Sequence, residues 1–107
     1  MLNHKLEIYV PSTVNVDKPI DNTQQVEKVL KHLASRFGGA SAQQIRGCWI
    51  AENGNPVFEN TVICFAYCES DKLELGKTVL YFLAEYLKTA MQQEAVAVVI
   101  DGVMDFI

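Results

Sequence analysis

The sequence predicts a single α+β domain in which four strands and two helices follow one another in the order βαββαβ. Two long segments, between residues 21 and 38 and between residues 70 and 90, carry apolar residues at helical spacing. Four shorter segments are apolar on one or both faces at strand spacing, and an Asn53-Gly54 pair predicts a hairpin between two of them. A chain of 107 residues, half of them hydrophobic, suffices for one core. We therefore expect one domain over residues 1–107.

The first strand is expected over residues Lys5–Val10, because polar and apolar residues alternate there. Pro11 ends this strand, and its inward face consists of Leu6, Ile8 and Val10. A polar connection, Pro11–Asp21, follows. It is longer than most strand–helix links, and it is either a ligand-binding segment or a plain surface loop.

The first helix is expected to begin beside Asp21, Asn22 or Thr23, any of which can cap it through a side-chain oxygen. It ends at Gly38-Gly39, because glycine adopts the left-handed conformation without a steric penalty. His32 lies beside the inward stripe and is expected on the surface. That stripe consists of Val26, Val29, Leu30, Leu33 and Phe37.

The central hairpin carries the only tryptophan, Trp49. Its strands are expected over residues Gln44–Ala51 and Val57–Tyr67. Trp49 shares a strand face with Ile45, Gly47 and Ala51. The second of these strands is apolar on both faces, which is typical of a central strand covered on both sides.

The second helix is expected to begin at Ser70 or Asp71, with Asp71 and Glu74 at the spacing of a capping box. Gly76 lies inside this helix, where glycine costs about 1 kcal/mol relative to alanine, so we expect a close backbone approach there. The inward stripe consists of Leu73, Val79, Leu80, Leu83, Leu87 and Ala90, and a second apolar stripe of Leu75, Phe82 and Tyr86.

The last strand is expected over residues Ala95–Ile100, followed by a turn at Asp101-Gly102. Residues Val103–Ile107 form an apolar tail that would aggregate if it were free. We expect this tail to pack on the body of the domain or on a neighbouring molecule.

Arranged in this order, the elements predict a ferredoxin-like fold, a four-stranded antiparallel sheet with both helices on one face. The other sheet face is bare, and Tyr9, Trp49 or Phe65 makes it partly apolar. Such a face in an acidic protein is usually covered by a second subunit. We therefore expect a homo-oligomer, most simply a dimer.

Charge and hydropathy argue against nucleic-acid and membrane partners. The net charge is −4, the isoelectric point is about 5.0, and the nine basic residues are scattered. Tyr9 and Phe65 could mimic the paired aromatics of an RNA-recognition module, but the acidic balance argues against that interpretation. The longest apolar run, Ala95–Ile100, is too short to span a bilayer, and the N-terminal residues lack the apolar core of a signal peptide. We expect a cytoplasmic protein without membrane contact.

Three cysteines, Cys48, Cys64 and Cys68, are predicted to be small apolar core residues. An odd number of cysteines does not suit a secreted disulfide framework. The alternative is a metal site built from the three thiolates with His4 or His32, but their spacing matches no common zinc pattern. We therefore expect no metal and no cofactor.

Four residues, Arg36, Arg46, Trp49 and Glu59, are the candidate ligand-binding residues. In one interpretation they form a pocket, where an arginine binds an anion, Trp49 is a platform and Glu59 is an acceptor or base. In the other, Arg46 and Glu59 form a cross-strand ion pair and Trp49 belongs to the core. No catalytic residue can be named, because no Ser/His/Asp set, phosphate-binding loop or metal-spaced cluster is evident in the sequence.

The pattern Phe37-Gly38-Gly39-Ala40-Ser41, Gly47-x-Trp49, Gly54 and Glu59 resembles a family of small uncharacterised bacterial and mobile-element proteins. This resemblance covers most of the chain and implies no activity. The hairpin with tryptophan before its turn and glutamate after it is also similar to the divalent-cation-tolerance CutA proteins. That similarity covers Trp49–Glu59, and it implies a ferredoxin-like trimer.

Two functions are compatible with these observations. The first is a non-catalytic oligomeric module that binds a small ligand or a partner protein. The second is a small cofactor-free enzyme with a pocket on the open sheet face. A cavity that contains Arg46, Trp49 or a histidine would favour the enzyme. The sequence favours the module, because His4 lies near the start of the chain, His32 lies on an outer helix, and no base–nucleophile pair is evident.

Overall fold

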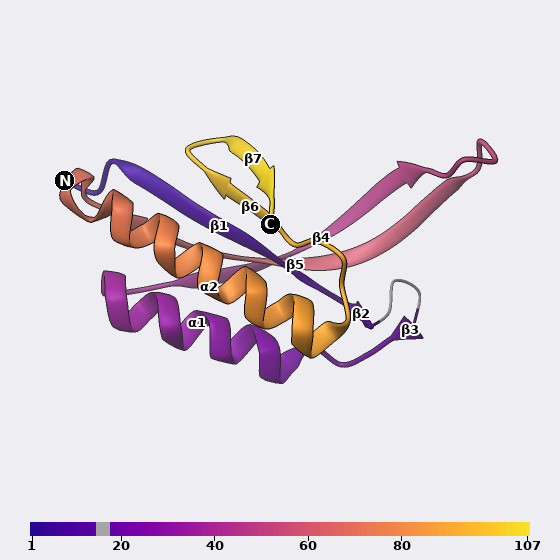
Figure 1. Cartoon of the computed structure of the whole chain (residues 1–107), viewed down its shortest axis with the longest axis horizontal. Helices are drawn as coiled ribbons and strands as arrows, with labels where there is room; N and C mark the ends of the chain where they lie inside the picture. Colours follow the sequence, from indigo (N-terminus) through magenta and orange to yellow (C-terminus); the bar gives the residue numbers. More distant parts are fainter. Residues whose placement is uncertain (15–17) are drawn as a thin grey trace.

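The computed structural model describes residues 1–14 and 18–107, and it shows an antiparallel sheet with two long helices on one face (Figure 1). The helices are α1 (Thr23–Phe37) and α2 (Leu73–Met91), and a 3₁₀ turn, η1 (Ser70–Lys72), precedes α2. The main sheet has the strand order β4-β5-β1-β6-β7, and β2 and β3 form a separate short ribbon. The strands are β1 (His4–Pro11), β2 (Thr13–Val14), β3 (Lys18–Pro19), β4 (Ser41–Ile50), β5 (Pro56–Cys68), β6 (Ala97–Ile100) and β7 (Val103–Phe106).

The sheet has five strands, so the prediction of four was wrong by one strand. The apolar tail forms β7, which pairs with β6 from Ile100 opposite Val103 to Ala97 opposite Phe106. The turn between them needs two residues with positive φ, and Asp101 (52°) and Gly102 (83°) supply them. The order of the other four strands is the one that the ferredoxin-like plan requires.

The core lies between the sheet and the helices. The inward residues of β1 are fully buried, as the strand alternation predicted. Gly76 lies so close to β1 that a Cβ atom there would be 2.6 Å from Leu6 Cδ1, which confirms the close approach expected at this glycine. Ala90 is exposed and Met91 is buried in its place, so the predicted stripe of α2 was wrong at its end. The buried helical residues are Val29, Leu33, Gly76, Val79, Leu80, Leu83, Ala84, Leu87 and Met91.

The helix starts differ in part from the predicted caps. Asp21 Oδ1 accepts hydrogen bonds from Thr23 N (3.0 Å) and Thr23 Oγ1 (2.6 Å) ahead of α1. At α2 no side-chain cap forms, and Glu74 pairs with Lys77 at 3.1 Å, so the predicted capping box was wrong. The η1 turn takes up Asp71, the residue that would have capped the helix in the box.

The hairpin of β4 and β5 extends well beyond the two helices (Figure 1), in a molecule whose extents are 45 × 25 × 21 Å. Because the helices do not reach the far half of the hairpin, large apolar side chains are exposed there. Trp49 is 49% exposed, so its alternative placement in the core was wrong. Part of the long connection after β1, residues 15–17, lies outside the described residues, and the binding role considered for this loop stays a prediction.

Candidate functional site

The register of the hairpin places Trp49 and Glu59 on the sheet face that the helices leave open. Trp49 lies opposite Val57, and Glu59 lies opposite Gly47. Residues directly opposite on antiparallel strands point to the same face, and alternate residues of β5 do so too. Cys64 of β5 is buried against the helices, so residues at odd positions of this strand, Glu59 among them, face away from the helices.

The two arginines lie elsewhere. Arg46 is opposite Asn60 on the other face of the hairpin, where its Nη1 donates to Asn60 Oδ1 at 3.4 Å. Its guanidinium also lies 5.2 Å from the ring centre of Phe58. The predicted cross-strand ion pair between Arg46 and Glu59 was therefore wrong. Arg36, in the last turn of α1, donates to Ser35 Oγ at 3.1 Å and lines none of the hollows near Glu59.

Trp49 and Glu59 line two hollows. The first lies on the open face, and the second extends around β5 to Phe58 and Asn60. Their volumes are about 420 Å³ and 520 Å³, a size that holds small-molecule ligands. Both are lined by Ser12, Thr13, Trp49 and Glu59. The first is also lined by residues of three further segments, namely Tyr9, Pro11, Thr61, Gln93, Ala95, Val96, Ala97, Met104 and Phe106.

Hydrogen bonds fix the wall of these hollows where β1 ends. Gln93 Nε2 donates to Thr13 O at 2.9 Å and to Met91 O at 3.1 Å. Asn22 Nδ2 donates to Pro11 O at 2.9 Å, and Ser12 Oγ donates to the Asn60 carbonyl. The end of β1 is thereby attached to β5, to the start of α1 and to the end of α2, so the hollow has a preformed wall.

Aromatic rings and one carboxylate give the first hollow its chemistry. Tyr9, Trp49 and Phe106 contribute rings to its lining. Among the described residues, neither the Glu59 carboxylate nor Trp49 Nε1 has a hydrogen-bond or ion-pair partner. Gly47, opposite Glu59, has no side chain to cover the carboxylate. A negative charge among rings suits a flat ligand that carries a positive charge.

The sequence identified Trp49 and Glu59 but missed Gln93, Met104 and Phe106. The last two belong to β7, and nothing in the pattern of that tail indicated a strand. Once β7 is recognised, the pairing of Ala97 with Phe106 puts Phe106 on the open face. Gln93 follows α2 in an irregular segment, where no periodic signal exists.

Elsewhere on the open face, the Lys5 side chain covers Phe65, one of the two rings considered as a stacking platform for RNA bases. Lys5 Nζ lies 4.6 Å from the ring centre of Phe65 and forms an ion pair with Glu7 at 2.7 Å. The hydrogen bond that the Lys5 ammonium donates to the Glu7 carboxylate is the main reason that the pKa of Lys5 is raised. Tyr9 and Phe65 therefore do not form an open pair of stacking rings.

The cysteines divide between the core and the surface. Cys64 and Cys68 are buried, as predicted, whereas Cys48 is exposed on the far half of the hairpin. Burial raises the pKa of Cys64 to about 12, and it is also the main cause of a raised pKa at Cys68. Within residues 1–14 and 18–107, no three His, Cys, Asp or Glu side chains are grouped as a metal site.

Comparison with solved structures shows the fold. The chain is similar to a phage SAM lyase in complex with S-methyl-5'-thioadenosine, with a TM-score of 0.66, 19% identity, and coverage of 97% of this chain and 86% of that chain. The chain is also similar to a phage SAM lyase in the apo state, with a TM-score of 0.66 and 21% identity, over 98% of this chain and 86% of that chain. A third similar structure is CutA from Synechococcus elongatus, with a TM-score of 0.56 and 10% identity, over 98% of this chain and 81% of that chain. No family model and no curated protein matches the sequence.

These identities are low enough that the likeness concerns the fold alone. The chain shares an α+β arrangement of two helices and a mostly antiparallel sheet with CutA, which agrees with the resemblance of the hairpin. The resemblance to small bacterial and mobile-element proteins stays a prediction. In the described part of the chain, no helix is both long and apolar enough to cross a membrane.

Proposed function

We propose that this chain is a small enzyme that binds a nucleoside carrying a sulfonium group in the first open-face hollow and cleaves it as a lyase. The observation that carries the proposal is the unpartnered Glu59 carboxylate among three aromatic rings. Rings attract a flat base by stacking and a sulfonium by the cation–π effect, and the carboxylate adds charge complementarity. The likeness to a phage SAM lyase that holds S-methyl-5'-thioadenosine supports this class of ligand.

The reaction class suits a site without a base–nucleophile pair. When the carbon–sulfur bond of SAM breaks, an oxygen of the substrate's own carboxylate bonds to that carbon and closes a lactone. The electron pair of the broken bond stays on sulfur, and the neutral thioether S-methyl-5'-thioadenosine leaves. The bond is activated by the positive charge that the substrate itself carries. The protein then contributes mainly position and electrostatics, for which Trp49 and Glu59 are the proposed residues.

Binding is tested by thermal denaturation of the purified chain with SAM or S-methyl-5'-thioadenosine. A ligand present at about ten times its Kd adds ~1.4 kcal/mol of stability, which raises Tm by about 5–10 °C in a domain of this size. Turnover is tested by chromatographic detection of S-methyl-5'-thioadenosine released from SAM. Release without enzyme gives the background rate.

Matched variants test the site. We expect Glu59→Gln and Trp49→Ala each to weaken binding at least tenfold, since each removes a group that lines both hollows. Arg46 lies on the same hairpin but on its other face, so the control variant Arg46→Ala should leave binding unchanged. If neither nucleoside raises Tm, or if Arg46→Ala weakens binding as much as Glu59→Gln does, the proposal is wrong.

A second candidate function, a non-catalytic oligomeric binding module, is favoured by a different observation. Two large apolar side chains of β7 that line the same hollow are exposed, Met104 at 46% and Phe106 at 66%. We propose that copies of the chain cover this surface. Ligand binding without release of product, by a chain that self-associates, would favour the module over the enzyme.

A further inference from the structure

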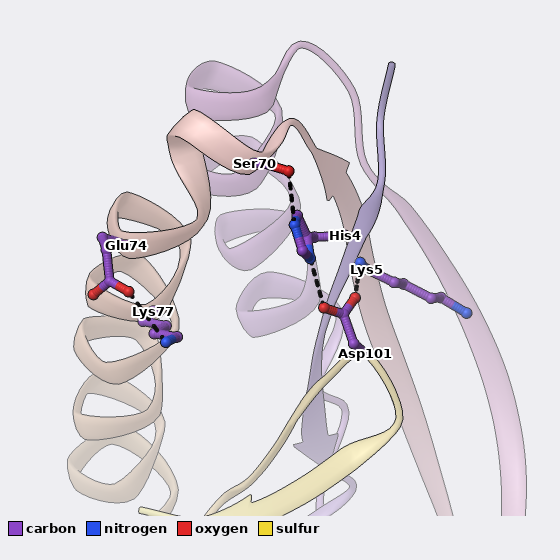
Figure 2. Close-up of polar contacts among 6 residues, drawn as sticks. All are labelled: His4, Lys5, Ser70, Glu74, Lys77 and Asp101. Atoms are coloured by element: carbon purple, nitrogen blue, oxygen red, sulfur yellow. Dashed lines mark hydrogen bonds and ion pairs between the residues drawn. The ribbon is translucent and has the colours of Figure 1, made fainter.

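A second cluster of reactive groups lies away from the open-face hollow, at the end of the sheet where β1 begins. His4 lies between Ser70 and Asp101, and the three residues come from three separate segments of the chain (Figure 2). His4 Nδ1 is 2.6 Å from Asp101 Oδ2, and His4 Nε2 is 3.0 Å from Ser70 Oγ. The sequence alone did not reveal this group, because 66 and 97 residues separate His4 from its two partners.

The surroundings of Asp101 determine which way the protons lie. Its Oδ1 accepts the backbone N–H of Lys5 at 2.8 Å, and its own N–H donates to Lys5 O at 3.0 Å. The hydrogen bond from His4, followed by that from Lys5, lowers the pKa of Asp101. An ionised carboxylate only accepts, so His4 Nδ1 carries a hydrogen. In the neutral tautomer of His4 that this implies, Nε2 accepts the hydroxyl hydrogen of Ser70.

This order of atoms, hydroxyl to imidazole to carboxylate, is the one that activates a serine nucleophile. The Ser70 residue is exposed, and the side chains of His4 and Asp101 are 23% and 40% exposed, so a substrate can reach the hydroxyl. Residues on both sides of Ser70 line a hollow of about 190 Å³, whose lining is Leu2, Phe37, Cys68, Glu69 and Lys72. That volume suits a short acyl group, and because Ser70 does not itself line the hollow, the carbonyl of the bound ester would lie outside it, towards Ser70.

We propose that Ser70, His4 and Asp101 form a second catalytic site, which transfers or hydrolyses short-chain acyl esters. Ser70 Oγ bonds to the carbonyl carbon, and its proton passes to His4 Nε2. The carbon–oxygen bond of the ester then breaks, and the alcohol leaves with that proton. Water attacks the acyl-serine in the same way, gives its proton to His4, and the acid leaves as Ser70 regains its hydrogen.

Lys72 is the side chain to which we assign the stabilisation of the oxyanion. It lines the small hollow, and among the described residues its ammonium group has no ion-pair partner. Asp101 acts through His4 and is a positioning residue. The arrangement makes no use of Glu59 or Trp49, so the two proposed sites stand or fall separately.

The first test labels the intact chain with a fluorophosphonate, which bonds to activated serines, and maps the label by mass spectrometry. We expect the label on Ser70 in the parent chain and a rate at least tenfold lower in His4→Gln and Asp101→Asn. Ser70→Ala should remain unlabelled. Ser35→Ala is the matched control, because Ser35 is also exposed but its Oγ bonds to His32 O (2.9 Å) and to Arg36.

The second test follows hydrolysis of p-nitrophenyl acetate and p-nitrophenyl octanoate. We expect turnover of the acetate that Ser70→Ala abolishes, that Ser35→Ala leaves unchanged, and that falls at least tenfold with the longer chain. The cluster could instead serve only to attach β1 to η1 and to the β6–β7 turn. In that case His4→Gln would lower Tm without changing either the labelling or the hydrolysis. That result, or a folded parent chain that takes no label at Ser70, would overturn the proposal.

Discussion

At the scale of single residues, Gly76 shows how one contact can override a local propensity. Glycine inside an exposed helix is worse than alanine by about 1 kcal/mol. Here the added methyl group would stand 2.6 Å from Leu6 Cδ1 and 3.0 Å from Cδ2. Leu6 is fully buried, so it has no free space into which to move. The glycine therefore sets the distance between α2 and β1.

We predict that Gly76→Ala lowers the free energy of unfolding by about 1–2 kcal/mol, because overpacking costs more than the helix gains. Urea denaturation measures the change. The matched background is Leu6→Val, which removes the two Cδ atoms that the new methyl group would meet. In that background Gly76→Ala should become neutral or stabilising. Equal effects in both backgrounds would mean that the contact with Leu6 is not what excludes alanine.

At the scale of elements, the termini of the helices show where sequence signals are reliable. Gly38 follows α1 with φ +91°, and its N–H donates to Ala34 O at 2.9 Å. This left-handed position satisfies a carbonyl at the helix end, and the glycine pair predicted it from sequence. The start of α2 depends on how the η1 turn packs, and the spacing of Asp71 and Glu74 did not predict it.

We predict that Gly38→Ala destabilises the chain by about 1 kcal/mol, since a side chain in the left-handed region clashes with its own backbone. For a domain of this size, Tm should fall by about 4–8 °C. Gly39→Ala is the control, because Gly39 does not have a positive φ and nothing lies within 4 Å of its added Cβ. The account of the helix end fails if the two variants have the same Tm.

The alternation of strand residues predicted most of the sheet and part of the site. Strand parity was enough to put Trp49 on one face of β4 and Arg46 on the other, yet the two were grouped as one candidate site. Which residues of the two strands lie side by side depends on the register of their pairing, and that register is set by contacts along all of β4 and β5. The short strand β7 was not predicted, because four residues after a tight turn show too little periodicity to distinguish a strand from an irregular tail.

At the scale of the whole molecule, both proposed sites join segments that are distant in sequence. The open-face hollow combines residues of β1, β4, β5, β7 and the segment after α2. The Ser70–His4–Asp101 cluster joins the first strand, the turn before α2 and the β6–β7 turn. No spacing rule within one segment reveals such groups, because only the packing of the sheet brings them together.

Self-association is the prediction that belongs to this scale. Phe106 on the open face and Phe82 on α2 are both exposed, at 66% and 58%, so exposure alone does not distinguish them. Phe106 lines the open-face hollow, whereas Phe82 does not line it and has the His32 ring beside it, with ring centres 5.7 Å apart. If copies of the chain cover each other's open faces, Phe106 should be buried in the assembly and Phe82 should stay exposed.

We predict a solution mass, measured by light scattering at micromolar concentration, of two or more chains. Phe106→Glu should shift it towards one chain, because a charge at the centre of an apolar interface is costly to desolvate. Phe82→Glu adds the same charge on the other face and should leave the mass unchanged. If the parent chain is monomeric, or if Phe82→Glu alone dissociates it, the open face is not where copies meet. The hollow beside Phe106 would then be complete within one chain, and ligand binding should not depend on protein concentration.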